Sequence, residues 1–209
     1  NNTALNELSC NDNQLTSLDL SNNISLIHLV CHLNELTTLS VENNVELITL
    51  VAYQNQLTSI DVSNNPLLEN LNIWGNQFSS IDISLNPNLS WLDVNGMQLT
   101  SLDVSSNTAL TGLSCGTNQL TTLDVSANTA LTELYCYNNQ LISLNMRNGV
   151  TVQLNEFGAT DNSSLTCIET LDPAYATANW TNANGNIDAG VTFDVICGAE
   201  ARTHWYVAT

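Results

Sequence analysis

Residues 108–126 read TALTGLSCGTNQLTTLDVS, and residues 129–146, which begin 21 positions later, read TALTELYCYNNQLISLNM. The same pattern of leucines and asparagines runs through seven consecutive blocks of 21 residues. The blocks begin at Thr3, Ile24, Val45, Pro66, Pro87, Thr108 and Thr129. A fixed period in this range is typical of a solenoid, in which each repeat forms one coil and stacks on its neighbours.

The pattern within a block, L-x-x-L-x-(C/A/I/V)-x-x-N-x-L, is that of a leucine-rich repeat. In the block that begins at Thr129, alternation along a strand turns Leu134 and Cys136 inward and Tyr135 outward. We expect Asn139 to hydrogen-bond to backbone groups inside the turn that follows. A second extended segment, residues 144–146, completes the coil. Stacked at roughly 4.8 Å, such coils predict a β-rich solenoid with parallel β-sheets on both faces.

The regularity of the repeats divides the chain into four regions. We predict seven leucine-rich repeats over residues 1–149, an imperfect last repeat over 150–168, a C-terminal cap over 169–198 that shields the open end of the core, and a tail over 199–209. The first repeat has no comparable cap, so we expect this chain to be part of a longer one. Met97 replaces the turn asparagine of its repeat, so we expect that turn to be distorted.

The charge of the chain excludes several classes of partner. It has no lysine, two arginines and 20 acidic residues, which give a net charge of −18. Nucleic-acid binding and docking on anionic membranes both need basic side chains, so we expect neither. No apolar run approaches the ~18 residues of a membrane span, so we expect no membrane insertion. Self-repulsion of this charge favours a monomer.

The six cysteines fall into two classes. One set occupies the eighth position of its repeat, where free cysteine serves as a small buried hydrophobic residue. This set comprises Cys10, Cys31, Cys115 and Cys136. Cys167 and Cys197 lie outside the repeats and flank the irregular terminal segment, so we predict a disulfide between them. Such a bond would indicate an oxidising compartment.

The repeats and the cap together resemble those of secreted leucine-rich-repeat proteins of the Bacteroidota, which are similar to internalins. The resemblance is carried by the two repeats quoted above, by SSLTCIETLD at residues 163–172 and by ANWTNANGNIDAGVTFDVIC at residues 178–197. Cys167 and Cys197 occupy the matching places of that family's terminal cap. The resemblance covers residues 1 to about 197, and it implies a secreted or cell-surface protein that functions in binding and adhesion.

Two sets of residues are candidates for a metal site. An aspartate recurs after the second core leucine of most repeats, at Asp19, Asp61, Asp82, Asp103 and Asp124. Neighbouring serines and backbone N–H groups would relieve its repulsion, and the alternative is bound Ca²⁺, with the last four aspartates as ligands. His28 and His32 would stand ~13 Å apart on a strand, too far to share a metal ion.

The chain carries none of the common catalytic motifs, so we expect no enzymatic activity. Instead, the outward positions of the first strand vary from repeat to repeat and hold five of the nine Tyr and Trp residues. Aromatic residues on a rigid surface favour recognition, although they also favour strands in general. The candidate ligand-binding residues are Tyr53, Trp74, Trp91, Asp93, Asn72, Asn95, Tyr135 and Tyr137.

Three functions fit this face. A solenoid of this kind usually grips a protein partner, and we expect the main contact over repeats three to five. In the same patch the rings of Tyr53 and Trp74 should stand about 4.8 Å apart. The second possibility is a glycan, with Tyr53, Trp74 or Trp91 stacking on sugar rings. The third is a passive spacer within a larger surface protein.

Overall fold

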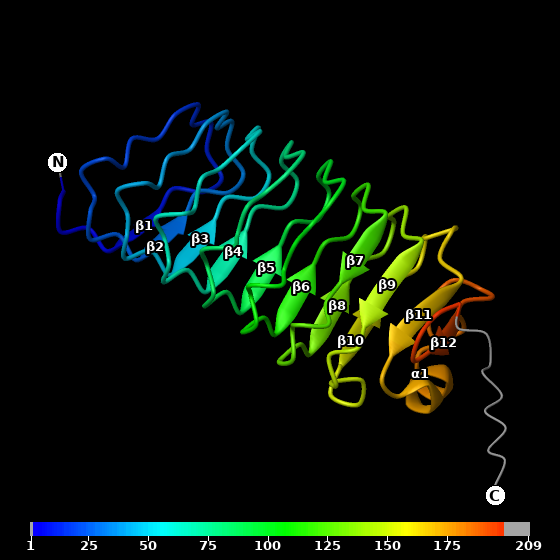
Figure 1. The fold of residues 1–209 in the computed structure, drawn as a ribbon. Coiled ribbons are helices and arrows are strands. Elements are labelled where there is room, and N and C mark those ends of the chain that lie inside the picture. The colour runs from blue at the N-terminus through cyan, green and yellow to red at the C-terminus, as the bar shows by residue number, and fades with distance from the viewer. Residues whose placement is uncertain (1, 199–209) are drawn as a thin grey trace, which may run out of the picture.

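The structure is a computed structural model that describes residues 2–198. Figure 1 shows coils stacked side by side along one axis, with β1 at one end of the stack and α1 and β12 at the other. The described part contains two parallel sheets, one of eight strands and one of four. The predicted β-rich solenoid with parallel sheets on both faces is therefore confirmed.

The eight-stranded sheet contains one short strand from each successive coil, and every pair in it is parallel. From β1 to β8 the register shifts by one repeat, so that Leu50 pairs with Leu29 on one side and with Leu71 on the other. The strands, in spatial order, are β1 (Glu7–Ser9), β2 (His28–Val30), β3 (Thr49–Val51), β4 (Asn70–Asn72), β5 (Trp91–Asp93), β6 (Gly112–Ser114), β8 (Glu133–Tyr135) and β10 (Glu156–Gly158).

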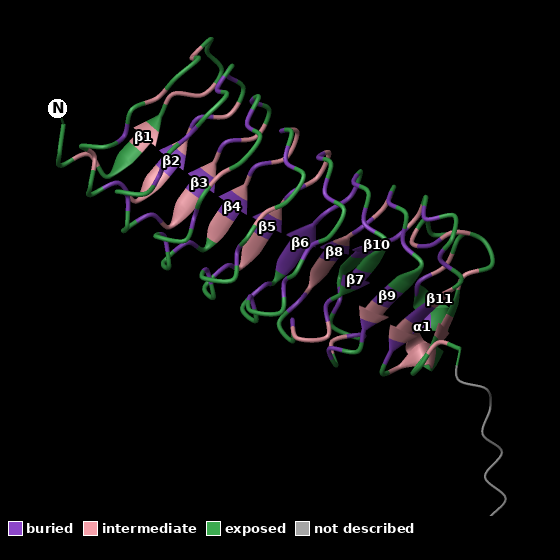
Figure 2. Ribbon diagram, turned by 45° about the horizontal axis from the view of Figure 1, so that its top comes forward, coloured by how far each residue is buried: buried purple, intermediate pink, exposed green. Residues whose placement is uncertain are grey.

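The core runs the length of the stack between the two faces. The central leucine of each strand from β2 to β8 is fully buried, and its neighbours on either side point outward because side chains alternate along a strand. In Figure 2 the buried positions form continuous lines from coil to coil. Cys31, Cys115 and Cys136 are free thiols within this core, and Cys10 is a half-buried free thiol, as predicted.

The turn asparagines join each coil to the preceding one. Nδ2 of Asn55 donates to the carbonyl oxygens of Ala52 and Cys31, each at 3.1 Å, and its Oδ1 accepts from the backbone N–H of Leu36 at 3.0 Å. A donor and an acceptor that would otherwise lie unsatisfied inside the coil are thus paired. The predicted role of this asparagine is confirmed.

The turn at Met97 keeps the geometry of its neighbours, so the expected distortion was wrong. Gly96 has φ 64° and donates to the carbonyl of Gly116 at 3.0 Å, as Gly75, with φ 66°, donates to Asn95 at 2.9 Å. Backbone bonds between coils therefore fix the path of this turn without the asparagine side chain. Met97 is almost fully buried and adds apolar area to the core in its place.

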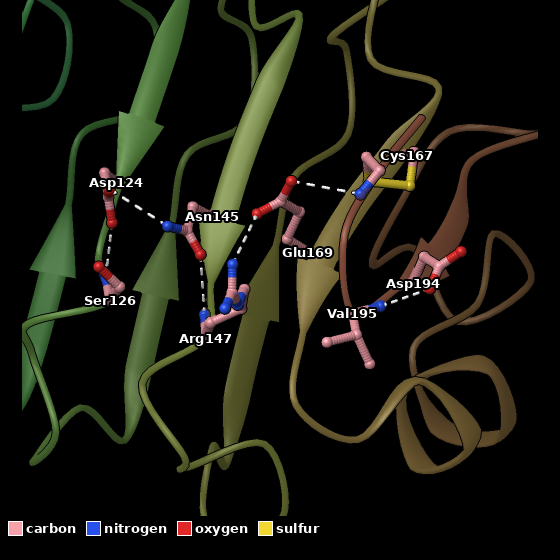
Figure 3. A network of polar contacts seen from close by, with 9 residues as sticks. Asp124, Ser126, Asn145, Arg147, Cys167, Glu169, Asp194 and Val195 are labelled. Atoms are coloured by element: carbon pink, nitrogen blue, oxygen red, sulfur yellow. Dashed lines mark hydrogen bonds and ion pairs between the residues drawn. A yellow bond between two sulfur atoms is a disulfide. The ribbon is translucent and has the colours of Figure 1, made fainter. Parts of the chain in front are cut away.

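The second sheet is shorter than the repeats suggest. It consists of β7 (Thr122–Asp124), β9 (Ser143–Met146), β11 (Cys167–Thr170) and β12 (Thr192–Asp194), all at the C-terminal end of the stack. In this sheet Asp124 faces Asn145, whose Nδ2 donates to the carboxylate at 3.2 Å (Figure 3). In earlier coils Asp61, Asp82 and Asp103 follow one another, and like charges directly opposite disfavour a ladder.

The C-terminal segment closes the end of the core. Helix α1 (Pro173–Asn179) begins at Asp172, whose side chain accepts from the N–H of Tyr175. Trp180, 5% exposed, packs against Phe157 and Phe193. The aspartate followed by proline is a helix-start signal, yet we expected only an irregular segment here.

The disulfide between Cys167 and Cys197 joins β11 to the residues after β12, with the two Cα atoms 5.8 Å apart. The predicted pairing is therefore confirmed. Within residues 2–198 no helix has the length and apolar character needed to cross a membrane. The predicted tail, 199–209, lies outside the described residues.

Candidate binding face

The outward surface of the eight-stranded sheet, called the strand face below, holds all eight candidate ligand-binding residues. Each coil contributes three outward positions, two within the strand and a third just after it. Tyr53, Trp74 and Asn95 occupy the third position of consecutive coils. Trp91 and Asp93 occupy the first and second positions of β5. The structure thus gathers these five side chains over repeats three to five.

Three aromatic rings form a continuous stack along the strand face. The ring of Tyr53 lies 5.0 Å from that of Trp74 with the planes inclined by 13°, which matches the expected spacing. On its other side Tyr53 lies 4.1 Å from the ring of His32, with the planes inclined by 15°. Sequence reasoning weighed His32 only as a metal ligand and missed it as the third ring, although it stands 21 positions before Tyr53 in the same column.

The stacking decides which ring surfaces a ligand can reach. Both faces of the Tyr53 ring are covered, one by His32 and the other by Trp74, so only its edge is open. Stacking of a sugar on Tyr53, which the sequence suggested, would require one of these two ring faces to be uncovered. Trp74 ends the stack, and within residues 2–198 it has no second ring partner. Its outer face is turned toward repeat five.

Trp91 does not stand upright on the strand face. A Cβ atom added to Gly112 in the neighbouring strand would lie 2.2 Å from Cε3 and Cζ3 of the Trp91 ring. The ring therefore leans away from repeat four and lies over Gly112, where only a glycine leaves room for it. Gly112 is buried beneath it. Sequence reasoning identified Trp91 but not the glycine that sets its orientation.

Tyr137 is oriented by a second glycine in the same way. A Cβ on Gly116 would lie 2.8 Å from Cζ of the Tyr137 ring. The hydroxyl of this ring accepts a hydrogen bond from Nδ2 of Asn95, two coils away, at 2.5 Å. Asn95 is thereby drawn toward repeat seven and away from Trp74. This hydrogen bond connects Tyr137 of repeat seven to the edge of the patch over repeats three to five. The neighbouring Tyr135 lies instead beside Gly158 of the next coil.

Asp93 is the half-buried carboxylate of the patch. It pairs with Asn72 on one side and Ser114 on the other in the parallel ladder. Its Oδ1 accepts from the backbone N–H of Asn95 at 3.1 Å. Burial raises the pKa of Asp93 above its usual value, and hydrogen bonds from Asn95 and Ser114 oppose that rise. The negative charge at this position is thus costly to the protein alone.

Two asparagine side chains beside Asp93 have incomplete hydrogen bonding. The amide oxygens of Asn70 and Asn72 are buried and have no donor. Asn70 pairs with Trp91, and Asn72 pairs with Asp93. Buried acceptors without a partner are uncommon in native proteins. These two oxygens lie beneath the surface of the patch.

The strand face is acidic. The strands carry Glu7, Asp93, Glu133 and Glu156, and within the described residues no lysine or arginine lies among them. Arg147 follows β9 of the other sheet, where it pairs with Glu169 at 3.8 Å (Figure 3). Burial, followed by the charges of Glu156 and Glu133, raises the pKa of the Tyr135 phenol. The face therefore repels anions.

The aspartate column on the opposite side is held by local hydrogen bonds. Oδ1 of Asp82 accepts from both the N–H and the hydroxyl of Ser84, at 3.0 and 2.7 Å. These bonds lower the pKa of Asp82, and the equivalent serines lower the pKa of Asp61 and Asp103. The local pairing expected from the sequence is present. Bound Ca²⁺ stays an untested alternative, and no group of three metal-ligating side chains occurs within residues 2–198.

Comparisons with known proteins place the fold. Neither a model of a protein family nor a curated protein matches the chain. Among solved structures, the functional domain of InlJ from Listeria monocytogenes, described as including a cysteine ladder, is 37% identical, with a TM-score of 0.74. The match covers 80% of this chain and 39% of that one. The free cysteines of the present chain likewise share one column of the repeats.

More distant structures agree with this assignment. A leucine-rich-repeat protein from Leptospira interrogans is 26% identical over 82% of this chain and 43% of that one, with a TM-score of 0.64. An internalin C2 from Listeria monocytogenes is 20% identical over 92% of this chain and 82% of that one, with a TM-score of 0.60. The chain spans 39% and 43% of the first two of these structures. It has an internalin-like leucine-rich-repeat fold.

Proposed function

We propose that the chain is a non-catalytic module that binds a protein partner through the strand face over repeats three to five. The observation that carries this proposal is the ordered aromatic surface formed by the His32–Tyr53–Trp74 stack and by Trp91. Aromatic side chains fixed on a rigid scaffold lose little conformational entropy on binding, and they are enriched among the residues that dominate interface energies.

The arrangement of the rings favours a protein over a glycan. The stack presents ring edges outward, and the faces of Tyr53 are covered. The outer face of Trp74 and the ring of Trp91 are the surfaces left for a planar sugar contact. A protein partner can use edges as well as faces, because its side chains adapt to either. A glycan is therefore the competing ligand class, and a passive spacer is the third possibility.

We also propose that the protein is secreted or displayed on a bacterial cell surface. The Cys167–Cys197 disulfide supports this location, because such bonds persist in oxidising compartments. The likeness to a Listeria internalin domain supports it as well. An origin in the Bacteroidota rests on the sequence resemblance alone.

The proposed function is tested by parallel capture with three immobilised chains: the wild type, Trp74→Ala and Thr58→Ala. Thr58 is exposed on the preceding coil and lies away from the strand face, so it is the control. The proposal predicts host or bacterial surface proteins that are retained by wild type and Thr58→Ala and lost with Trp74→Ala. Equal retention by all three would refute it. A glycan array probed with the same chains identifies the competing ligand class.

A further inference from the structure

Asp93 lies between two aromatic side chains on the strand face. Strand geometry places its Cα about 6.6 Å from that of Trp91 along β5 and about 8 Å from that of Trp74 across the ladder. The outer face of Trp74 is turned toward repeat five, the coil that carries Asp93, because its other face is stacked on Tyr53. A long side chain that reaches the Asp93 carboxylate would therefore pass beside the Trp74 indole.

The groups around Asp93 supply no positive charge within the described residues. Asn95, which could otherwise lie against Trp74, is held by the hydroxyl of Tyr137 two coils away. Trp91 leans over Gly112, away from Trp74. Within residues 2–198 the only arginine or lysine is Arg147, which is paired with Glu169 on the other sheet. No cation of the described chain thus neutralises Asp93.

We propose that this position receives an arginine or lysine side chain from a basic segment of the protein partner. The inference rests on the proposed function of the strand face and specifies the chemistry of the partner. A guanidinium group pairs with a carboxylate through two parallel hydrogen bonds and stacks on an aromatic face, so Asp93 and Trp74 suit it together.

The charge of the whole chain supports the same partner. A net charge of −18 attracts a basic surface over a distance and raises its rate of association. It gives no such advantage to a neutral glycan. The strand face itself contributes Glu133 and Glu156 beyond Tyr137, so that a basic segment lying along the face would meet further carboxylates. The cost of keeping Asp93 charged and half buried is offset when a cation pairs with it.

The test measures binding of two peptides to the 209-residue chain by titration calorimetry. One is acetyl-Gly-Arg-Gly-Arg-Gly-Arg-Gly-amide, and the other replaces each arginine by citrulline, which is neutral and nearly the same shape. The variants are Asp93→Asn and the control Glu42→Gln, which removes one exposed charge away from the strand face. Titrations at about 20 mM and about 300 mM NaCl show how far binding depends on screened charge.

The proposal predicts that wild type binds the arginine peptide at least about tenfold more tightly than the citrulline peptide, because each charge-assisted contact is lost with citrulline. Asp93→Asn should weaken binding of the arginine peptide by about tenfold or more, whereas Glu42→Gln should change it less than about twofold. Equal affinity of wild type and Asp93→Asn for the arginine peptide, equal affinity for both peptides, or no binding of the arginine peptide would overturn it.

The failure of this inference is distinguishable from failure of the proposed function. Cellohexaose serves as a neutral glycan probe in the same assay. If cellohexaose binds wild type but not Trp74→Ala, and the arginine peptide does not bind, the ligand is a glycan and the inference is wrong. A captured partner that needs Trp74 but binds Asp93→Asn as tightly as wild type would overturn the cation site and leave the strand face as the binding surface.

Discussion

The rings of Tyr53 and Trp74 are stacked in parallel, 5.0 Å apart, across two neighbouring coils. The pair extends to His32 on one side and ends at Trp74 on the other. The backbone ladder fixes this spacing, because equivalent residues of adjacent coils are paired in register. The stack is therefore a property of the repeat, and it leaves a single indole face open where the column changes to Asn95.

Replacing the middle ring should disrupt the stack from both sides. Tyr53→Ala removes two ring contacts and should lower the free energy of unfolding by about 1–3 kcal/mol, since each aromatic pair contributes about 0.5–1.5 kcal/mol beyond its buried area. Urea denaturation followed by fluorescence measures this change. The exposed control Thr58→Ala on the same coil should fall within about 0.5 kcal/mol of wild type. Equal stability of Tyr53→Ala and Thr58→Ala would contradict the stack.

Alanine substitutions at two strand glycines test the orientation of the Trp91 ring. A methyl group at Gly112 would meet the Trp91 ring at 2.2 Å, so Gly112→Ala must displace that ring. We expect a loss of about 1–3 kcal/mol, as for overpacking, together with a red shift of tryptophan emission. Gly158→Ala in β10 places its methyl 3.7 Å from Tyr135, an ordinary contact, and should be tolerated. Indistinguishable spectra and stabilities of the two variants would show that Trp91 does not lie over Gly112.

The sequence predicted the coil but not the orientation of side chains on its surface. Leu29, Leu50 and Leu71 recur at one spacing, so the strand, its register and the core follow from the period alone. The distance between Tyr53 and Trp74 followed from the same period. The lean of Trp91 depends on a contact between coils that only Gly112 permits, and a single strand pattern does not encode such a contact.

The 21-residue period does not predict the helix of the cap or the extent of the second sheet. Helix α1 lies beyond the repeats and depends on its own start signal at Asp172 and Pro173. The second sheet forms where Asn145 interrupts the aspartate column, although every repeat contains a similar core pattern there. Ser40 also interrupts the aspartate column, and no strand forms there, so charge alone does not set the extent of that sheet.

Asp93 should make the protein less stable as pH rises. Because burial raises its folded-state pKa above the unfolded value of about 3.9, its contribution is fully present below that value and is lost as pH rises through the folded pKa. Asp93→Asn removes this loss, so the variant should be more stable than wild type at pH 7, and the difference should shrink toward pH 3. Thermal unfolding across this range measures it.

The control for this pH dependence is Asp82→Asn, for which the sign is opposite. Ser84 lowers the pKa of Asp82, so its contribution is present above the unfolded pKa and is lost as pH falls through the folded pKa. Asp82→Asn should therefore be slightly less stable than wild type at neutral pH. A destabilised Asp93→Asn at pH 7 would contradict the proposed cost of the buried carboxylate.

Fewer thiols should react in the folded protein than after denaturation. Burial raises the pKa of Cys31 and of Cys136 to about 12, and raises the pKa of Cys115 as well. Only the thiolate reacts with a disulfide reagent, so these three should be inert at pH 8 in the folded protein. After denaturation without reductant, four thiols per chain should react. Six reactive thiols in protein from an oxidising compartment would contradict the Cys167–Cys197 bond.

We propose that the strand face over repeats three to five is the main contact surface of the protein. The dissociation constant of a captured protein partner, measured for wild type, Trp74→Ala, Trp91→Ala and Thr58→Ala, tests this directly. Trp74→Ala should weaken binding by about 2 kcal/mol or more, the range of an interface anchor, and Thr58→Ala should leave it unchanged. Unchanged affinity of both Trp74→Ala and Trp91→Ala would show that the partner binds elsewhere.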